Sequence, residues 1–116
     1  MLHHVSLEIA PDARERCIEF WRALGFEQVA EPEPLRGNVT WLQRGGTQIH
    51  LIHTEGSTVP VLGHAAVVVD DFDGAVAALE EDGHEFAEAD ELWGERRGFA
   101  ITPSGHRVEL MAAPPG

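Results

Sequence analysis

The sequence has 116 residues, a common length for one domain, and its 43% hydrophobic and 24% charged residues are those of an ordinary globular protein. The formal net charge of -12 argues against nucleic acid as a partner, because such binding needs clustered cations. The eight basic residues are all arginine. No apolar run approaches the roughly 18 residues of a membrane span and the N-terminal segment does not resemble a signal peptide, so we expect a cytoplasmic protein with no membrane contact.

The first half predicts a strand over residues 3–9 and then a helix. Asp12, with Glu15 three residues later, has the pattern of an N-cap and its partner, and Gly25 has the residue type that ends helices. We therefore expect a helix from Asp12 to about Leu24. Alternating apolar residues predict three further strands, at 26–30, 39–43 and 48–52.

The second half repeats this order. LGHAAVVVDDFDGAVAALEEDGHEF, from Leu62, matches LHHVSLEIAPDARERCIEFWRALGF, from Leu2, and Asp71 and Gly83 bracket its helix. Strands are expected at 64–69, 84–86, 99–102 and 107–111. Each half is then β-α-β-β-β, which predicts an α+β fold of two tandem modules.

We treat residues 1–116 as a single domain built from these modules. Module one covers about 1–55, a linker about 56–61, and module two about 62–113. Two longer connections, 31–38 and 88–98, are the expected rims of a pocket.

Four residues occupy equivalent places in the two halves. His4 corresponds to His64, and His50, in GGTQIHL, corresponds to Glu109, in SGHRVEL. Side chains alternate across a strand, and this alternation puts all four on the faces turned away from the helices. Any one of these histidines alone is as well explained as a polar strand residue. Together, three imidazoles and a carboxylate suit one divalent transition metal: Zn, Ni, Mn, Fe or Co.

The remaining histidines are expected to stay outside this site. His3 and His53 have the opposite alternation, while His84 and His106 lie near turns and are interpreted as surface or strand-end residues. The single cysteine, Cys17, is interpreted as part of a buried helix face.

The motifs HHVSLEIAPDARERCIEFWRALGF, TQIHLI, GHAAVVVDD and PSGHRVELMAAP resemble those of the vicinal oxygen chelate superfamily, which includes glyoxalase I, bleomycin-binding proteins and extradiol dioxygenases. The resemblance covers nearly the whole chain. It implies two half-barrels around a metal and substrate cavity, with His4, His50, His64 and Glu109 at the four ligand positions. Because many members pair two chains, it also implies a homodimer.

The resemblance leaves the reaction open. Glyoxalase-like members usually have Glu or Gln where this chain has His50. A fosfomycin-type thiol transferase is disfavoured because the chain has no lysine, and an extradiol dioxygenase because it has no tyrosine.

Two functions follow as hypotheses. The first is a metal-dependent glyoxalase-like lyase or isomerase for a small substrate with vicinal oxygens, with Glu109, or else Glu8, as the catalytic base. The second is a non-catalytic protein that sequesters a drug or metabolite through aromatic residues. The expected pocket residues are Trp41, Trp93, Arg96 and Phe99. Trp93 could instead anchor its loop, and Arg96 and Arg97 could be solvated counter-charges rather than an anion clamp.

Overall fold

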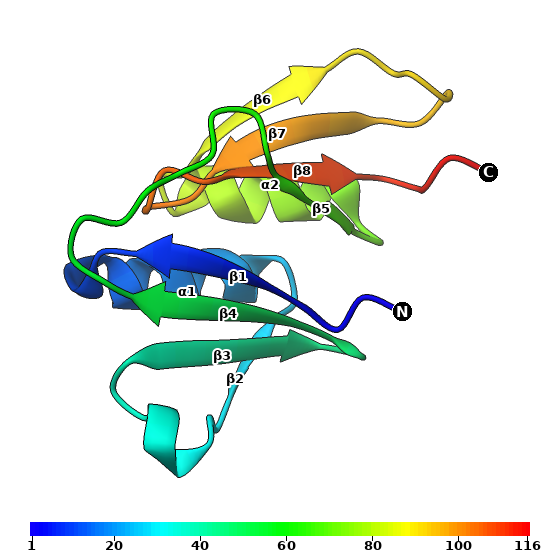
Figure 1. The fold of residues 1–116 in the computed structure, drawn as a ribbon. Helices are drawn as coiled ribbons and strands as arrows, with labels where there is room; N and C mark the ends of the chain where they lie inside the picture. The colour runs from blue at the N-terminus through cyan, green and yellow to red at the C-terminus, as the bar shows by residue number, and fades with distance from the viewer. The chain divides into compact units, whose positions relative to one another are not determined.

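Two β-α-β-β-β modules follow one another in the computed structural model, which describes residues 1–116. They form two compact units, Met1–Val59 and Pro60–Gly116, and the boundary falls inside the linker expected at 56–61. Each unit has one four-stranded mixed sheet, and neither sheet closes into a barrel (Figure 1). The α+β fold of two tandem modules is therefore confirmed.

The sheet of the first unit has the order β1-β4-β3-β2, with β1 parallel to β4 and the other pairs antiparallel. Two short 3-10 turns, Pro11–Ala13 and Glu33–Leu35, interrupt its connections. The elements are β1 (His4–Ile9), α1 (Arg14–Ala23), β2 (Glu27–Val29), β3 (Val39–Arg44) and β4 (Thr47–His53).

Alternation along β4 separates a core face from a polar face in this unit. Ile49 and Leu51 are buried, as are Cys17 and Trp21 of α1, so the apolar side of the helix and of the sheet form the core. The Trp21 ring packs edge-to-face against Phe26. The buried position expected for Cys17 on the helix is therefore confirmed. The opposite face of the sheet is left for the polar side chains.

The expected N-cap at Asp12 is wrong. Pro11 opens the 3-10 turn that includes Asp12, so α1 begins only at Arg14, with Ala13 as its N-cap and no capping side chain. The ring of Pro11 fixes its φ angle at a value suited to the start of a helical turn, so the turn begins at Pro11. Asp12 therefore lies inside this turn and not in front of the helix. The predicted stop is confirmed, since Gly25 has a φ of 90°.

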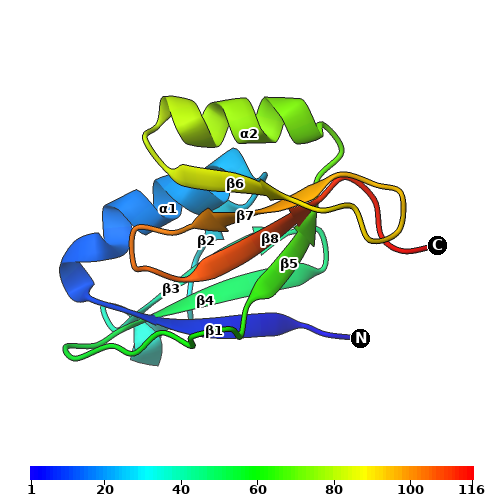
Figure 2. The ribbon, with the colours of Figure 1, turned by 90° about the horizontal axis from the view of Figure 1, so that it is seen from above.

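The second unit repeats the arrangement with the sheet order β5-β8-β7-β6 and with β5 parallel to β8. Its helix lies along the sheet beside β6, as Figure 2 shows, and Phe72 meets Phe86 there edge-to-face. The elements are β5 (Ala65–Val68), α2 (Phe72–Glu81), β6 (Glu85–Ala89), β7 (Arg97–Ile101) and β8 (Arg107–Met111).

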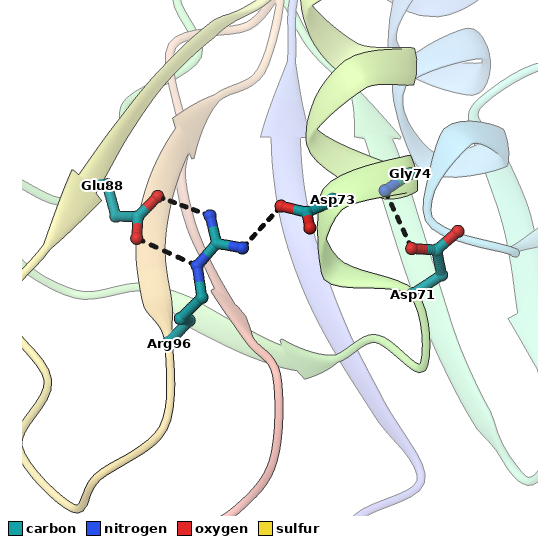
Figure 3. Close-up of polar contacts among 5 residues, drawn as sticks. All are labelled: Asp71, Asp73, Gly74, Glu88 and Arg96. Carbon is teal, nitrogen blue, oxygen red and sulfur yellow. Dashed lines mark hydrogen bonds and ion pairs between the residues drawn. The ribbon is translucent and has the colours of Figure 1, made fainter.

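The start of α2 agrees with the sequence. Asp71 is the N-cap, and its Oδ1 accepts a hydrogen bond from the backbone N–H of Gly74 at 3.0 Å (Figure 3). This bond satisfies one of the helix donors that lack an internal partner. Gly83, with a φ of 83°, ends the helix as expected.

The connection expected at 88–98 is shorter than predicted. Glu88 pairs with Gly98 and Ala89 with Arg97, so both ends of the segment belong to strands and only residues 90–96 connect them. Gly98 permits this close pairing: a Cβ at this position would lie 2.7 Å from the carbonyl oxygen of Ala87 and closer still to the Phe86 ring.

His84 and His106 directly precede β6 and β8, which agrees with the expected strand-end positions, but both are buried, so the surface alternative is wrong. His106 belongs to the turn between β7 and β8, where its Nδ1 lies 2.7 Å from Ser104 Oγ and its backbone N–H donates to Thr102 Oγ1 at 3.0 Å. A short turn that folds onto its own side chains buries polar groups that look exposed in the sequence.

Among the helices of the chain, none has the length and apolar character that a membrane span requires.

Candidate functional site

The second unit brings two of the predicted ligands together. His64 lies just before β5, Glu109 lies in β8, and His64 Nε2 is 3.1 Å from Glu109 Oε1. On the other side of the ring, Nδ1 is 2.9 Å from the carbonyl oxygen of Leu62. Since a carbonyl only accepts, Nδ1 carries a proton and Nε2 faces the carboxylate.

This arrangement requires a positive species between the two groups. A neutral imidazole that donates from Nδ1 would turn the Nε2 lone pair toward carboxylate lone pairs, so either a proton or a cation must lie there. Two ligands of one metal with bonds of about 2.0–2.1 Å lie about 2.9–3.3 Å apart in octahedral or tetrahedral geometry. The observed 3.1 Å fits that spacing, and the Leu62 carbonyl orients the ring as outer partners of metal-binding histidines do.

The other carboxylate oxygen of Glu109 faces an arginine. Arg97 Nη1 lies 3.7 Å from Glu109 Oε2, and both side chains are largely buried, at 13% and 12% exposure. Arg97 and His64 therefore hold the carboxylate from its two sides and orient it on this face of the sheet.

An aromatic ring lies at the centre of the same face. Phe99 pairs with Glu109 in the ladder between β7 and β8, and the ring is 5.2 Å from that of His64 in an edge-to-face contact. The guanidinium of Arg107 lies over it at 4.3 Å and that of Arg97 at 5.5 Å. Arg107 was not selected from the sequence, although it has the same alternation as Glu109 on β8.

The first unit brings together the other two predicted ligands in a different way. The rings of His4 and His50 are stacked, with centroids 4.0 Å apart and an interplanar angle of 18°. His3 joins them: its Nδ1 is 2.9 Å from that of His4, so its predicted separation from this pair is wrong. His3 precedes β1, and alternation does not apply outside a strand.

A glutamine fixes the tautomer of His50. Gln48 Nε2 donates to Gln43 Oε1 at 2.7 Å, which leaves Gln48 Oε1 as the acceptor for His50 Nε2, also at 2.7 Å. His50 is therefore protonated on Nε2, and Nδ1 keeps a lone pair. Neither glutamine was selected from the sequence, although Gln48 has the same alternation as His50.

The environment of His50 favours its neutral form. Burial lowers the pKa of His50 below its usual value of 6.5, and the neighbouring His4 and His3 lower it further because one positive charge disfavours another. A neutral imidazole is the form that binds a metal ion. By contrast, His53 lies on the helix-facing side, with Nε2 2.9 Å from the Oγ1 of buried Thr40, as its alternation predicted.

Trp41 completes the stack in the first unit. It pairs with His50 across β3 and β4, and the two rings are stacked at 4.2 Å with an angle of 3°. Glu8 is further away: it stands four residues after His4 on β1, about 13 Å along the strand, and its Oε1 accepts from the backbone N–H of Thr58 at 3.3 Å.

Arg96 and Trp93 have partners of their own. Two nitrogens of Arg96 bind Glu88, at 2.9 and 3.1 Å, and Nη1 binds Asp73 Oδ1 at 2.5 Å (Figure 3). The guanidinium also lies over the ring of Phe72, 4.6 Å from its centroid. These bonds hold the first turn of α2 to the sheet. Trp93 Nε1 donates to the carbonyl oxygen of Ala113 at 2.9 Å, which anchors its loop.

Neither unit by itself gathers three or more histidine, cysteine, aspartate or glutamate side chains into a group that could hold a metal ion. Each unit instead presents one pair, His4 with His50 and His64 with Glu109.

Comparison with known protein families shows to which family the chain belongs. Residues 2–110 match the model of the Glyoxalase/Bleomycin resistance protein/Dioxygenase superfamily. The chain belongs to this superfamily. The vicinal oxygen chelate resemblance is thus confirmed, and no curated protein matches the sequence.

Several solved structures have the same fold. The chain is similar to a glyoxalase family protein from Bacillus anthracis, with 23% identity over 96% of this chain and 93% of that one and a TM-score of 0.85. It is also similar to a glyoxalase/dioxygenase from Nostoc punctiforme, with 21% identity over 98% and 91% and a TM-score of 0.78. A third is TnmS3, an antibiotic binding protein from Streptomyces sp. CB03234, with 18% identity over 96% and 93% and a TM-score of 0.74.

Proposed function

We propose that the chain is a metal-dependent glyoxalase-like lyase or isomerase acting on a small substrate with two neighbouring oxygens. The observation that carries this proposal is the contact between His64 and Glu109, in which Nε2 and Oε1 are 3.1 Å apart while Leu62 holds Nδ1. Superfamily membership supports the same chemistry. In this proposal His4, His50, His64 and Glu109 hold one divalent ion.

The donor set fits such an ion. Neutral imidazoles and a carboxylate bind Zn, Ni, Mn, Fe or Co. In each ring one nitrogen is held by a protein acceptor, and the opposite nitrogen, Nε2 of His64 or Nδ1 of His50, is the one that would bind the ion. When bound, the ion supplies Lewis-acid polarisation of the two substrate oxygens.

The protein supplies the proton transfer. Glu109 takes the proton from the substrate carbon next to the polarised oxygen and returns it to the neighbouring carbon in an isomerisation, or to the same carbon in an epimerisation. His64 and Arg97 orient its two oxygens for this transfer. Glu8, about four residues along β1 from His4, is the weaker candidate because it is tied to the Thr58 backbone.

Hydrogen exchange in D2O tests the reaction. Metal-loaded wild type and Glu109→Gln are mixed with 2-oxoaldehyde thiol adducts and epimerisable thioesters, and deuterium incorporation at the reacting carbon is followed by NMR. The proposal predicts incorporation by the wild type that falls at least 100-fold in Glu109→Gln, in line with the usual effect of a general base. Equal exchange by both proteins would remove Glu109 from the mechanism.

A second function is favoured by the stacked rings of Trp41, His50 and His4 and by the likeness to an antibiotic binding protein. Such a surface suits a flat aromatic ligand. If the chain only binds, ligand affinity survives chelation of metals and falls in Trp41→Leu. The enzyme proposal predicts instead that chelation removes activity.

A further inference from the structure

The face of the second sheet that holds Glu109 also holds a largely buried arginine, two of whose nitrogens have no hydrogen-bond acceptor. Arg97 Nε and Nη1 are buried and have no hydrogen-bond partner, and the 3.7 Å from Nη1 to Glu109 Oε2 is longer than a hydrogen bond. Buried N–H donors normally have an acceptor, because a donor that is removed from water without one is costly.

Arg96, the residue before Arg97, shows that this chain can provide carboxylate acceptors for a guanidinium. Arg96 binds the carboxylates of Glu88 and Asp73, and the chain has 20 acidic residues for eight arginines. Arg97, by contrast, is buried with two donors left over. The missing acceptor is therefore best supplied from outside the chain.

A second guanidinium lies beside the first. Arg107 and Arg97 both lie over the ring of Phe99, at 4.3 and 5.5 Å. The ion pairs on this face are His64 with Glu109 and Arg97 with Glu109, and neither includes Arg107. Two guanidiniums therefore face one carboxylate, which makes this patch locally positive in a protein of net charge -12.

We propose that Arg97, with Arg107 across the Phe99 ring, binds an oxyanion of a small ligand: a carboxylate, phosphonate or phosphate. The planar guanidinium matches such groups through two parallel hydrogen bonds. The Phe99 ring is next to both guanidiniums and packs against the apolar part of the ligand. The inference adds a substrate class to the proposed enzyme, but it rests on the second unit alone and needs no metal.

Calorimetry with phenylphosphonate tests this proposal on the whole chain in the presence of a chelator. Wild type binds phenylphosphonate and not benzamide, which has the ring without the charge. Arg97→Gln weakens binding at least 10-fold, as expected for the loss of charged hydrogen bonds. Arg22→Gln removes the same charge from an exposed position in α1 and leaves the affinity unchanged. No binding by the wild type, or equal losses in both variants, overturns the proposal.

If Arg97→Gln does not fold, an NMR titration of the wild type tests the same proposal. The side-chain Nε–H resonances of the arginines are followed by NMR during a phenylphosphonate titration without metal. The resonance of Arg97 shifts with saturation and that of Arg22 does not. Binding that leaves Arg97 unmoved overturns the proposal. Both experiments exclude metal, so failure of the metal site does not affect their outcome.

Discussion

His64 and Glu109 meet through Nε2 and Oε1 at 3.1 Å, whereas the equivalent residues of the first unit, His4 and His50, stack face to face at 4.0 Å. The two halves of the repeat therefore differ at equivalent positions. In the second unit, the donor atoms already have the spacing of two ligands on one ion. In the first unit, the lone pairs of nearly parallel rings run alongside each other and do not converge.

Metal binding should therefore open the stack of His4 on His50. The His50 ring lies between the rings of Trp41 and His4, and its protons are shifted by the currents of both. Addition of Zn²⁺ should move these protons toward the positions of an unstacked histidine, as observed by NMR. The same addition to Glu109→Ala should leave them in place. Unchanged His50 resonances in Zn-loaded wild type would contradict a ligand role for this residue.

Asp71 should contribute to stability where Asp12 does not. Asp71 accepts the hydrogen bond from the Gly74 N–H, so Asp71→Ala should lower the free energy of unfolding by about 1 kcal/mol. Asp12 lies in the 3-10 turn with no capping bond, and Asp12→Ala should change it by less than about 0.5 kcal/mol. Urea unfolding of both variants checks this, and equal effects would contradict the assignment of the caps.

Gly98 should not tolerate a side chain. A Cβ there would collide with the Phe86 ring and the Ala87 carbonyl oxygen, so Gly98→Ala should cost about 1–3 kcal/mol of unfolding free energy. Gly46→Ala is the matched control, because nothing lies within 4 Å of a Cβ there. A Gly98→Ala protein as stable as the control would mean that β6 and β7 do not pair as described.

The bridge from Glu88 to Arg96 should make stability depend on pH in the acid range. The hydrogen bond from Arg96 lowers the pKa of the Glu88 carboxyl below its usual 4.5. Its contribution is complete above that value and is lost as the pH falls through the lower, folded value. A ¹³C NMR titration of Glu88 should show the low pKa, and Arg96→Gln should restore the usual one. Equal titration in both proteins would mean that the bridge is absent in solution.

Alternation and the internal repeat were enough to predict the two modules and the separation of core and polar faces. The apolar positions of β4 and β8 predict burial because a strand turns every second side chain to the same side. The same rule placed His50 and Glu109 away from the helices. The rule cannot predict how two such side chains contact each other. The same alternation leads to a ring stack for His4 and His50 and to a polar contact for His64 and Glu109.

The errors arose where contacts other than strand alternation decide the outcome. Pro11 moved the helix start past Asp12, and the turn around Ser104 buried His106. The extent of β7 depends on its pairing with β6, which local sequence does not contain. Once β7 begins at Arg97, that arginine shares a face with Phe99, while Arg96 reaches Glu88 and Asp73 instead.

Metal content tests the central claim most directly. Tag-free protein is loaded with Zn²⁺, Ni²⁺, Mn²⁺, Fe²⁺ or Co²⁺, desalted and analysed for bound metal, together with His64→Ala and Glu109→Ala. The proposed site predicts about one ion per wild-type chain with at least one of these metals and a large loss in both variants, because each removes one of four ligands. Wild type that retains none of the five, or variants that retain as much as the wild type, would contradict it.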